Sequence, residues 1–157
     1  MAALLIGNHG RAMWDACSRE AEFLDGLPNP MDRWTRRVIL AALAELPDRA
    51  TALFPFGAEL WPFQRFAKRA MGLKPSPLGL LIHPQYGLWH ALRAAIVFPH
   101  VDLGGAPVHK VIHACDDCIE KPCLSTCPVN AFSDSGFAVA ACRSWLDGNG
   151  SSQNDST

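Results

Sequence analysis

The sequence has no long hydrophobic run and no excess of charge of one sign. Its most apolar later stretch, residues 78–98, is interrupted by histidine, proline, glutamine and arginine, so we expect no membrane span. The apolar opening, residues 1–7, is short and has no basic residues before it, so it does not predict a signal peptide. Lys and Arg total 14 against 15 Asp and Glu, without a long basic run, which argues against a nucleic-acid partner.

The 157 residues are enough for one compact domain, or for one domain with a small module, and 49% of them are apolar. A chain of this size and composition can bury a core, which excludes disorder throughout. Gly and Pro contribute 12 residues each, a content that favours short elements joined by many loops.

Two segments near the N-terminus have the apolar spacing of amphipathic helices. We predict the first helix over residues 11–25, with Gly26 as a cap. The second is predicted over residues 32–46, where Pro47 marks the stop.

The middle of the chain changes from a helical to a β-like pattern. A third helix is predicted to begin with Pro62 and to close at Gly72. Residues 78–82 are a short apolar run and residues 83–87 form a predicted turn. The apolar spacing of residues 88–98 fits both a helix and a strand with one inserted charge, and we favour the strand.

Four of the six cysteines lie within 13 residues, whereas Cys17 and Cys142 stand apart. The clustered cysteines are Cys115, Cys118, Cys123 and Cys127. A disulfide framework would spread its bridges along a secreted chain, so the cluster indicates a metal site in a reducing compartment. We therefore expect the protein to be cytoplasmic.

The four clustered cysteines form the pattern C-x2-C-x4-C-x3-C-P, which ends at Pro128. A [4Fe–4S] cluster takes one soft thiolate per iron, and a short loop can surround it while backbone amides hydrogen-bond the sulfurs. The pattern resembles the cysteine motif of bacterial ferredoxins, in the close variant found in the electron-transfer subunits of molybdopterin oxidoreductases. The resemblance covers about residues 111–145. It implies a ferredoxin-like module in which the four cysteines hold the irons and Pro128 shapes the end of the loop.

The pattern departs from a two-cluster ferredoxin after Cys142, which resembles the first cysteine of a second half. In that arrangement Cys127 would ligate the second cluster, but no cysteine follows Cys142. Either the sequence stops before a second motif, or one cluster is held by the four clustered cysteines. Cys142 is the rival fourth ligand.

A structural zinc site is the alternative occupant, because zinc also takes four cysteines. Zinc sites usually use two well-separated CxxC pairs, so the spacing favours iron–sulfur. Cys17 lies on an apolar helical face and is predicted to be a buried thiol and not a ligand. His109 and His113 flank the module and are expected to be ordinary loop residues.

Three acidic residues, Asp116, Asp117 and Glu120, lie among the clustered cysteines. They are interpreted either as an acidic docking rim for a redox partner protein or as a solvated loop.

A second resemblance involves residues 83–99, which begin His-Pro-Gln-Tyr-Gly-Leu-Trp-His-Ala-Leu-Arg. The segment resembles one in cobalamin-processing (decyanase) proteins. Its position before a ferredoxin motif also resembles epoxyqueuosine reductases and reductive dehalogenases, where a corrinoid domain precedes iron–sulfur clusters. The resemblance implies cobalamin or flavin contacts from His83, Tyr86, Trp89 and Arg93. The simpler interpretation is a turn followed by a core strand, with Trp89 packed inside.

Together these patterns predict an α+β protein with three parts. A helical N-terminal region with a few strands, residues 1–107, includes a Gly/Pro linker at 102–107. The ferredoxin-like iron–sulfur module spans 108–146, and a polar disordered tail spans 147–157. The expected function is one-electron transfer through a [4Fe–4S] cluster. The alternatives are a corrinoid- or flavin-dependent reductase fed by the cluster and a zinc-stabilised interaction protein; the spacing predicts no catalytic residues.

Overall fold

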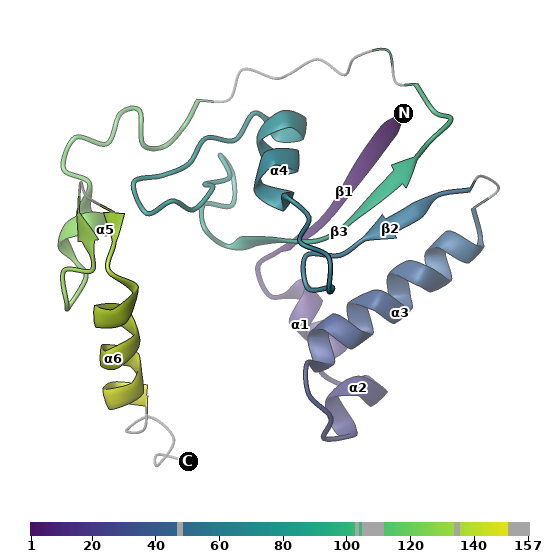
Figure 1. Cartoon of the computed structure of the whole chain (residues 1–157), viewed down its shortest axis with the longest axis horizontal. Coiled ribbons are helices and arrows are strands. Elements are labelled where there is room, and N and C mark those ends of the chain that lie inside the picture. The colour runs from purple at the N-terminus through teal and green to yellow at the C-terminus, as the bar shows by residue number, and fades with distance from the viewer. Residues whose placement is uncertain (47–48, 103, 105–111, 134–135, 151–157) are drawn as a thin grey trace.

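A three-stranded antiparallel sheet organises the N-terminal region (Figure 1). The computed structural model describes residues 1–46, 49–102, 104, 112–133 and 136–150. The strands are β1 (Ala2–His9), β2 (Thr51–Leu53) and β3 (His90–Phe98). They lie in the order β1-β3-β2, so β3 is central although it comes last in the chain.

The predicted strand at residues 88–98 is confirmed, because β3 covers all but its first two residues. β1 is not among the predicted elements, because the apolar opening was considered only as a signal peptide. The opening does not alternate between apolar and polar residues, so it lacks the pattern that predicts a half-buried strand.

Two longer helices cover opposite faces of the sheet. They are α3 (Pro30–Ala44) and α4 (Phe63–Met71). On one face, Ile39 of α3 packs with Phe54, Ala94 and Ile96. On the other face, Ala67 of α4 packs with residues of the following loop and with strand residues. Because successive strand side chains point to opposite faces, the neighbours Leu5 and Ile6 contact different clusters.

The predictions of these two helices are confirmed to within a few residues. α3 begins two residues earlier than predicted, with Pro30 in its first turn, and the predicted stop Pro47 lies outside the described residues. Pro62 is the N-cap of α4 and not its first helical residue. Gly72 ends the helix with a left-handed φ of 66°, which a glycine adopts without a Cβ penalty.

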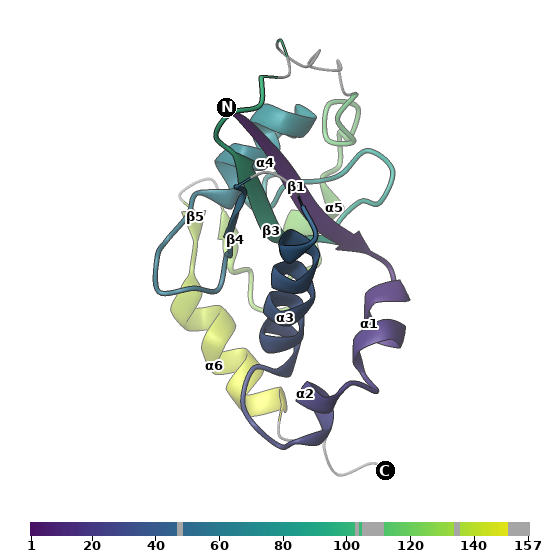
Figure 2. The same ribbon diagram turned by 90° about the vertical axis from the view of Figure 1, so that its right-hand side faces the viewer.

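The prediction of one helix over residues 11–25 is wrong. The segment forms two short helices, α1 (Ala12–Cys17) and α2 (Ala21–Leu24), and Gly26 follows with a left-handed φ of 70°. Glu20 interrupts the helix with an extended ψ of 160°. Arg37 of α3 binds Glu20 at 2.7 Å and Glu22 at 2.6 Å, so long-range ion pairs hold α2 beside the start of α3 (Figure 2). Local periodicity contains no information about such contacts.

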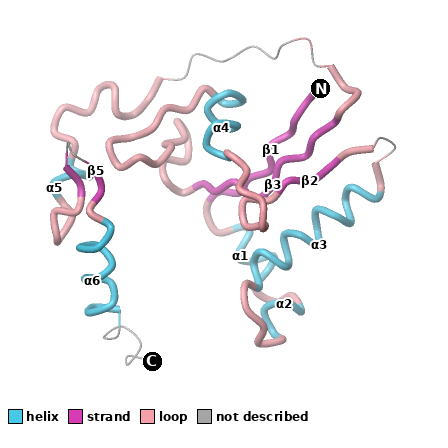
Figure 3. Tube along the Cα trace, in the orientation of Figure 1, coloured by secondary structure: helices cyan, strands magenta, loops and turns pink. Residues whose placement is uncertain are grey.

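Loops make up most of the chain between α4 and β3 (Figure 3). The predicted turn at residues 83–87 is confirmed by reciprocal backbone hydrogen bonds between His83 and Gly87, of 3.0 and 2.9 Å. The apolar run before it forms one isolated bridge, between Pro75 and Leu81, and no named strand. Most of the predicted linker at 102–107 lies outside the described residues.

The remaining elements form the cysteine module, which we define as residues 112–133 and 136–150. It contains α5 (Pro122–Ser125), β4 (Phe132–Ser133), β5 (Gly136–Phe137) and α6 (Val139–Gly150).

The structure shows the mixed helix and strand content expected of an α+β protein. The prediction of disorder is wrong for residues 147–150, which extend α6; adding residues to a helix that is already formed is easier than starting one. Residues 151–157, like the predicted module boundary at 107–108, lie outside the described residues. None of the described helices is long and apolar enough to cross a membrane.

Candidate functional site

The four clustered cysteines lie on one loop built around the short helix α5. All four are free thiols of intermediate burial. The loop folds back on itself at Lys121 and Asn130, two non-glycine residues with left-handed φ values of 43° and 48°. Pro122 then starts α5, which carries Cys123. The turn at Lys121 lies between Cys118 and Cys123, whereas the turn at Asn130 follows the last clustered cysteine.

The Cys115 thiol is influenced electrostatically by two of its neighbours. Burial raises the pKa of the Cys115 thiol above its ordinary value, and the neighbouring Cys123 and Cys118 raise it further. Nevertheless, no three Cys, His, Asp or Glu side chains converge as metal ligands in the described part of the chain. The donor set suits a soft metal or an iron–sulfur cluster, but ligation requires the thiols to lose protons and to move closer together.

Cys127 already accepts a backbone hydrogen bond at its sulfur. The N–H of the buried Ala131 lies 3.3 Å from Cys127 Sγ. The N–H of Ala138 donates to the carbonyl of Ala131 at 2.8 Å, and the N–H of Cys142 donates to the carbonyl of Ala138 at 3.2 Å. Backbone contacts through the β4–β5 hairpin thus connect the fourth clustered cysteine with its predicted rival, Cys142.

His113 is buried and ties the cysteine loop to the N-terminal region. Only 2% of its surface is exposed, so it is not an ordinary loop residue. Its Nδ1 accepts the N–H of Cys115 at 3.3 Å, which places the proton of the neutral ring on Nε2. Nε2 then donates to the carbonyl of Lys74 at 2.8 Å. Because both ring nitrogens are engaged, neither is free to ligate a metal. His109 lies outside the described residues.

The acidic residues of the loop differ in their contacts. Asp116 pairs with Lys74 at 3.0 Å, and this hydrogen bond lowers the pKa of its carboxyl. Asp117 and Glu120 are exposed. Their predicted role as a docking rim for a redox partner stays a prediction.

Cys17 is fully buried, as predicted for a thiol that is not a ligand. Its Sγ lies 3.7 Å from the carbonyl of Trp14, and burial raises its pKa. The thiol therefore stays protonated and serves as a small apolar side chain.

The predicted cofactor residues do not gather around one space. His83 stacks on Tyr86 with ring centroids 4.5 Å apart, and Tyr86 stacks on His9 at 3.9 Å. Trp89 is 79% exposed, so the interpretation that it is packed inside is wrong. It precedes β3 in a turn where its N–H bonds to the carbonyl of Tyr86, outside the part of the strand that packs in the core.

His83 is held as a neutral acceptor. Its Nδ1 accepts the backbone N–H groups of Gln85 at 3.1 Å and Tyr86 at 3.3 Å. Burial lowers the pKa of His83, and the nearby His90 and His9 lower it further. Protonation of Nδ1 would turn this acceptor into a donor, which would then face the two backbone N–H groups of Gln85 and Tyr86.

Arg93 points away from this ring stack because the sheet is irregular at its position. Ile6 pairs with Ala94, whereas the next residue, Gly7, pairs with Leu92, so Arg93 is an extra residue of β3. Such bulges re-aim side chains. A Cβ on Gly7 would lie 2.8 Å from the carbonyl oxygen of Ala91, so the close approach of the strands requires glycine there.

The re-aimed guanidinium of Arg93 reaches α3. Its Nη2 donates to Asp32 at 2.7 Å and to Thr35 Oγ1 at 3.2 Å. Asp32 and Thr35 are one helical turn apart and therefore share a face. The spacing of Asp32 and Thr35 can be read from the sequence, but their partner Arg93, 61 positions from Asp32, cannot.

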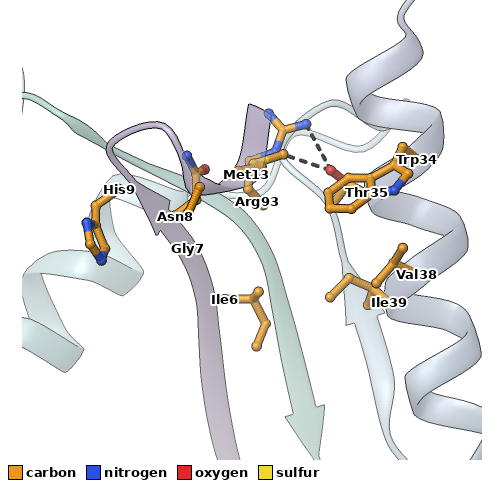
Figure 4. A pocket seen from close by; sticks show the side chains of 11 residues that line it. Ile6, Gly7, Asn8, His9, Met13, Trp34, Thr35, Val38, Ile39 and Arg93 are labelled. Carbon is orange, nitrogen blue, oxygen red and sulfur yellow. Dashed lines mark hydrogen bonds between the residues drawn. The ribbon is translucent and has the colours of Figure 1, made fainter. Parts of the chain in front are cut away.

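A cavity of about 420 Å³ lies between the sheet and α3 (Figure 4). Arg93 is the one predicted cofactor residue that lines it. The other lining residues come from β1, α1 and α3, and sequence reasoning missed them because they are dispersed along the chain.

Searches of protein-family models, curated proteins and solved structures find no match to this chain.

Proposed function

We propose that the protein transfers single electrons through a [4Fe–4S] cluster bound by Cys115, Cys118, Cys123 and Cys127. The observation that supports this proposal best is the set of four free, half-buried thiols in a C-x2-C-x4-C-x3-C-P pattern on one loop. Four soft donors in a short loop match the needs of four irons.

When bound, such a cluster supplies one-electron transfer between a donor and an acceptor protein. The residues of the chain have the task of holding it and of tuning its environment. The N–H of Ala131 directed at Cys127 Sγ is a hydrogen bond of the kind that stabilises negative charge on a cluster sulfur. His113 fixes the start of the loop through Cys115 and Lys74.

The clustered thiols also support a cytoplasmic location, since a reducing compartment keeps them available as ligands. Exposed Asp117 and Glu120 would give the cluster loop an acidic edge toward a redox partner protein.

Anaerobic purification followed by reconstitution with iron and sulfide tests the proposal. We expect a brown protein with about four irons per chain and, after reduction, an electron paramagnetic resonance signal of a [4Fe–4S] cluster. Stoichiometric zinc without iron after reconstitution would instead establish the zinc-stabilised alternative. Cobalt and flavin analysis of the same preparation tests the reductase alternative, which stays a prediction.

A further inference from the structure

The cavity between the sheet and α3 has an apolar body. Ile6 of β1, Met13 of α1, and Trp34, Val38 and Ile39 of α3 form its walls. Its volume of about 420 Å³ falls in the range of about 300–1,000 Å³ that is typical of small-molecule sites. The size and lining suit a molecule with one or two rings.

One end of the cavity is polar. Figure 4 shows Asn8, Arg93 and Thr35 at this end, away from Ile6 and Ile39. Asn8 Oδ1 is buried and accepts no hydrogen bond from the described part of the chain. A buried acceptor without a partner is costly, so this oxygen calls for a donor from a bound molecule.

Arg93 provides the complementary group. Its Nε and Nη2 donate to Thr35 and Asp32, whereas its Nη1 makes no hydrogen bond to the residues described. A guanidinium nitrogen can only donate, so Nη1 is available to an acceptor on a molecule in the cavity. The cavity therefore presents a buried acceptor without a partner and an available donor on neighbouring strands.

The charge of Arg93 is already balanced. Asp32 lies 2.7 Å from Nη2, and the two side chains are only 15% and 32% exposed. An anionic ligand would have to compete with this carboxylate and would bring a second negative charge into a partly dry site. An uncharged ligand avoids both costs.

We propose that the cavity binds a small, uncharged aromatic carboxamide. Its NH2 group donates to Asn8 Oδ1 and its carbonyl accepts from Arg93 Nη1. Its ring lies against Trp34, Val38 and Ile39. The site stands on the α3 face of the sheet, whereas Lys74, the contact of the cysteine module, directly follows Leu73 of the cluster on the α4 face. The inference is therefore independent of the proposed electron transfer.

Titration of the full chain with 2-naphthamide tests the inference, with 2-naphthoate and 2-(aminomethyl)naphthalene as charged probes of matched shape. Binding is followed by ligand-observed NMR and by calorimetry. We expect saturable binding of 2-naphthamide and at least about ten-fold weaker binding of both charged probes. Equal binding of the amide and the acid, or no saturable binding of the amide, would overturn the proposal.

Two variants locate the binding site. Val38→Trp fills the cavity and should abolish binding, whereas Leu40→Trp, on the same helix but not lining the cavity, should leave it unchanged. Asn8→Leu should weaken 2-naphthamide about ten-fold and should raise the melting temperature of the free protein, because it removes a buried acceptor without a partner. Unchanged 2-naphthamide affinity in folded Val38→Trp or in Asn8→Leu would contradict the proposed position. Cys118→Ala should bind the amide like the unaltered chain.

Discussion

Arg93 of β3 and Asp32 of α3 form an ion pair of 2.7 Å across 61 positions of the sequence. The pair joins the central strand to the helix that covers it, at the polar end of the cavity. It exists because the bulge opposite Gly7 turns Arg93 toward α3. A residue that family resemblance predicted as a cofactor contact therefore also has a structural role.

Removing this ion pair should destabilise the fold. Arg93→Met leaves Asp32 partly buried without its cation, so we expect the free energy of unfolding in urea to fall by about 1–3 kcal/mol. Arg11→Met is the matched control, because Arg11 and Asp15 are 82% and 56% exposed and their pair is screened by solvent. Its cost should be about 0.5 kcal/mol or less. Equal losses in the two variants would contradict the role given to Arg93.

Iron binding should depend on the loop cysteines and not on the buried one. Cys118→Ala is expected to abolish cluster assembly, whereas Cys17→Ala should retain about four irons per chain. Iron and sulfide analysis after identical reconstitution measures both variants. Loss of iron in folded Cys17→Ala would show that the core interpretation of this thiol is incomplete.

The fourth ligand can be assigned by comparing two cysteines. Cys142→Ala should keep the cluster, and Cys127→Ala should lose it, because only Cys127 belongs to the proposed ligand set. The measurement is iron content together with the visible spectrum. If Cys127→Ala keeps a cluster and the double variant does not, Cys142 is the ligand.

The neutral His83 ring should make the fold sensitive to mild acid. Its pKa lies below the ordinary value of 6.5 in the folded protein, so below pH 6.5 the unfolded chain binds a proton more readily. Stability should therefore fall as the pH decreases from about 6.5, and it should be regained on return to neutral pH. An NMR titration of the imidazole with urea unfolding at several pH values tests this. His83→Gln should flatten the dependence, and a folded-state pKa above 6.5 would contradict it.

Local patterns predicted the elements whose signals lie within one continuous segment. The apolar face of α3, the glycine that ends α4 and the apolar run of β3 all lie within single segments. The break between α1 and α2 was not predictable in this way, because Glu20 and Glu22 of this segment bind Arg37, which lies 15 or more positions further along the chain. β1 was missed because a strand that contacts both helices need not alternate apolar and polar residues.

The same division applies to the two candidate sites. The cysteine pattern can be read from the sequence alone, because all four cysteines lie within 13 consecutive residues. The position of Arg93, the exposure of Trp89 and the cavity became visible in the three-dimensional fold alone. A bulge and a cavity arise from the pairing of segments far apart in the chain, and that pairing is set by packing across the sheet rather than by neighbouring residues.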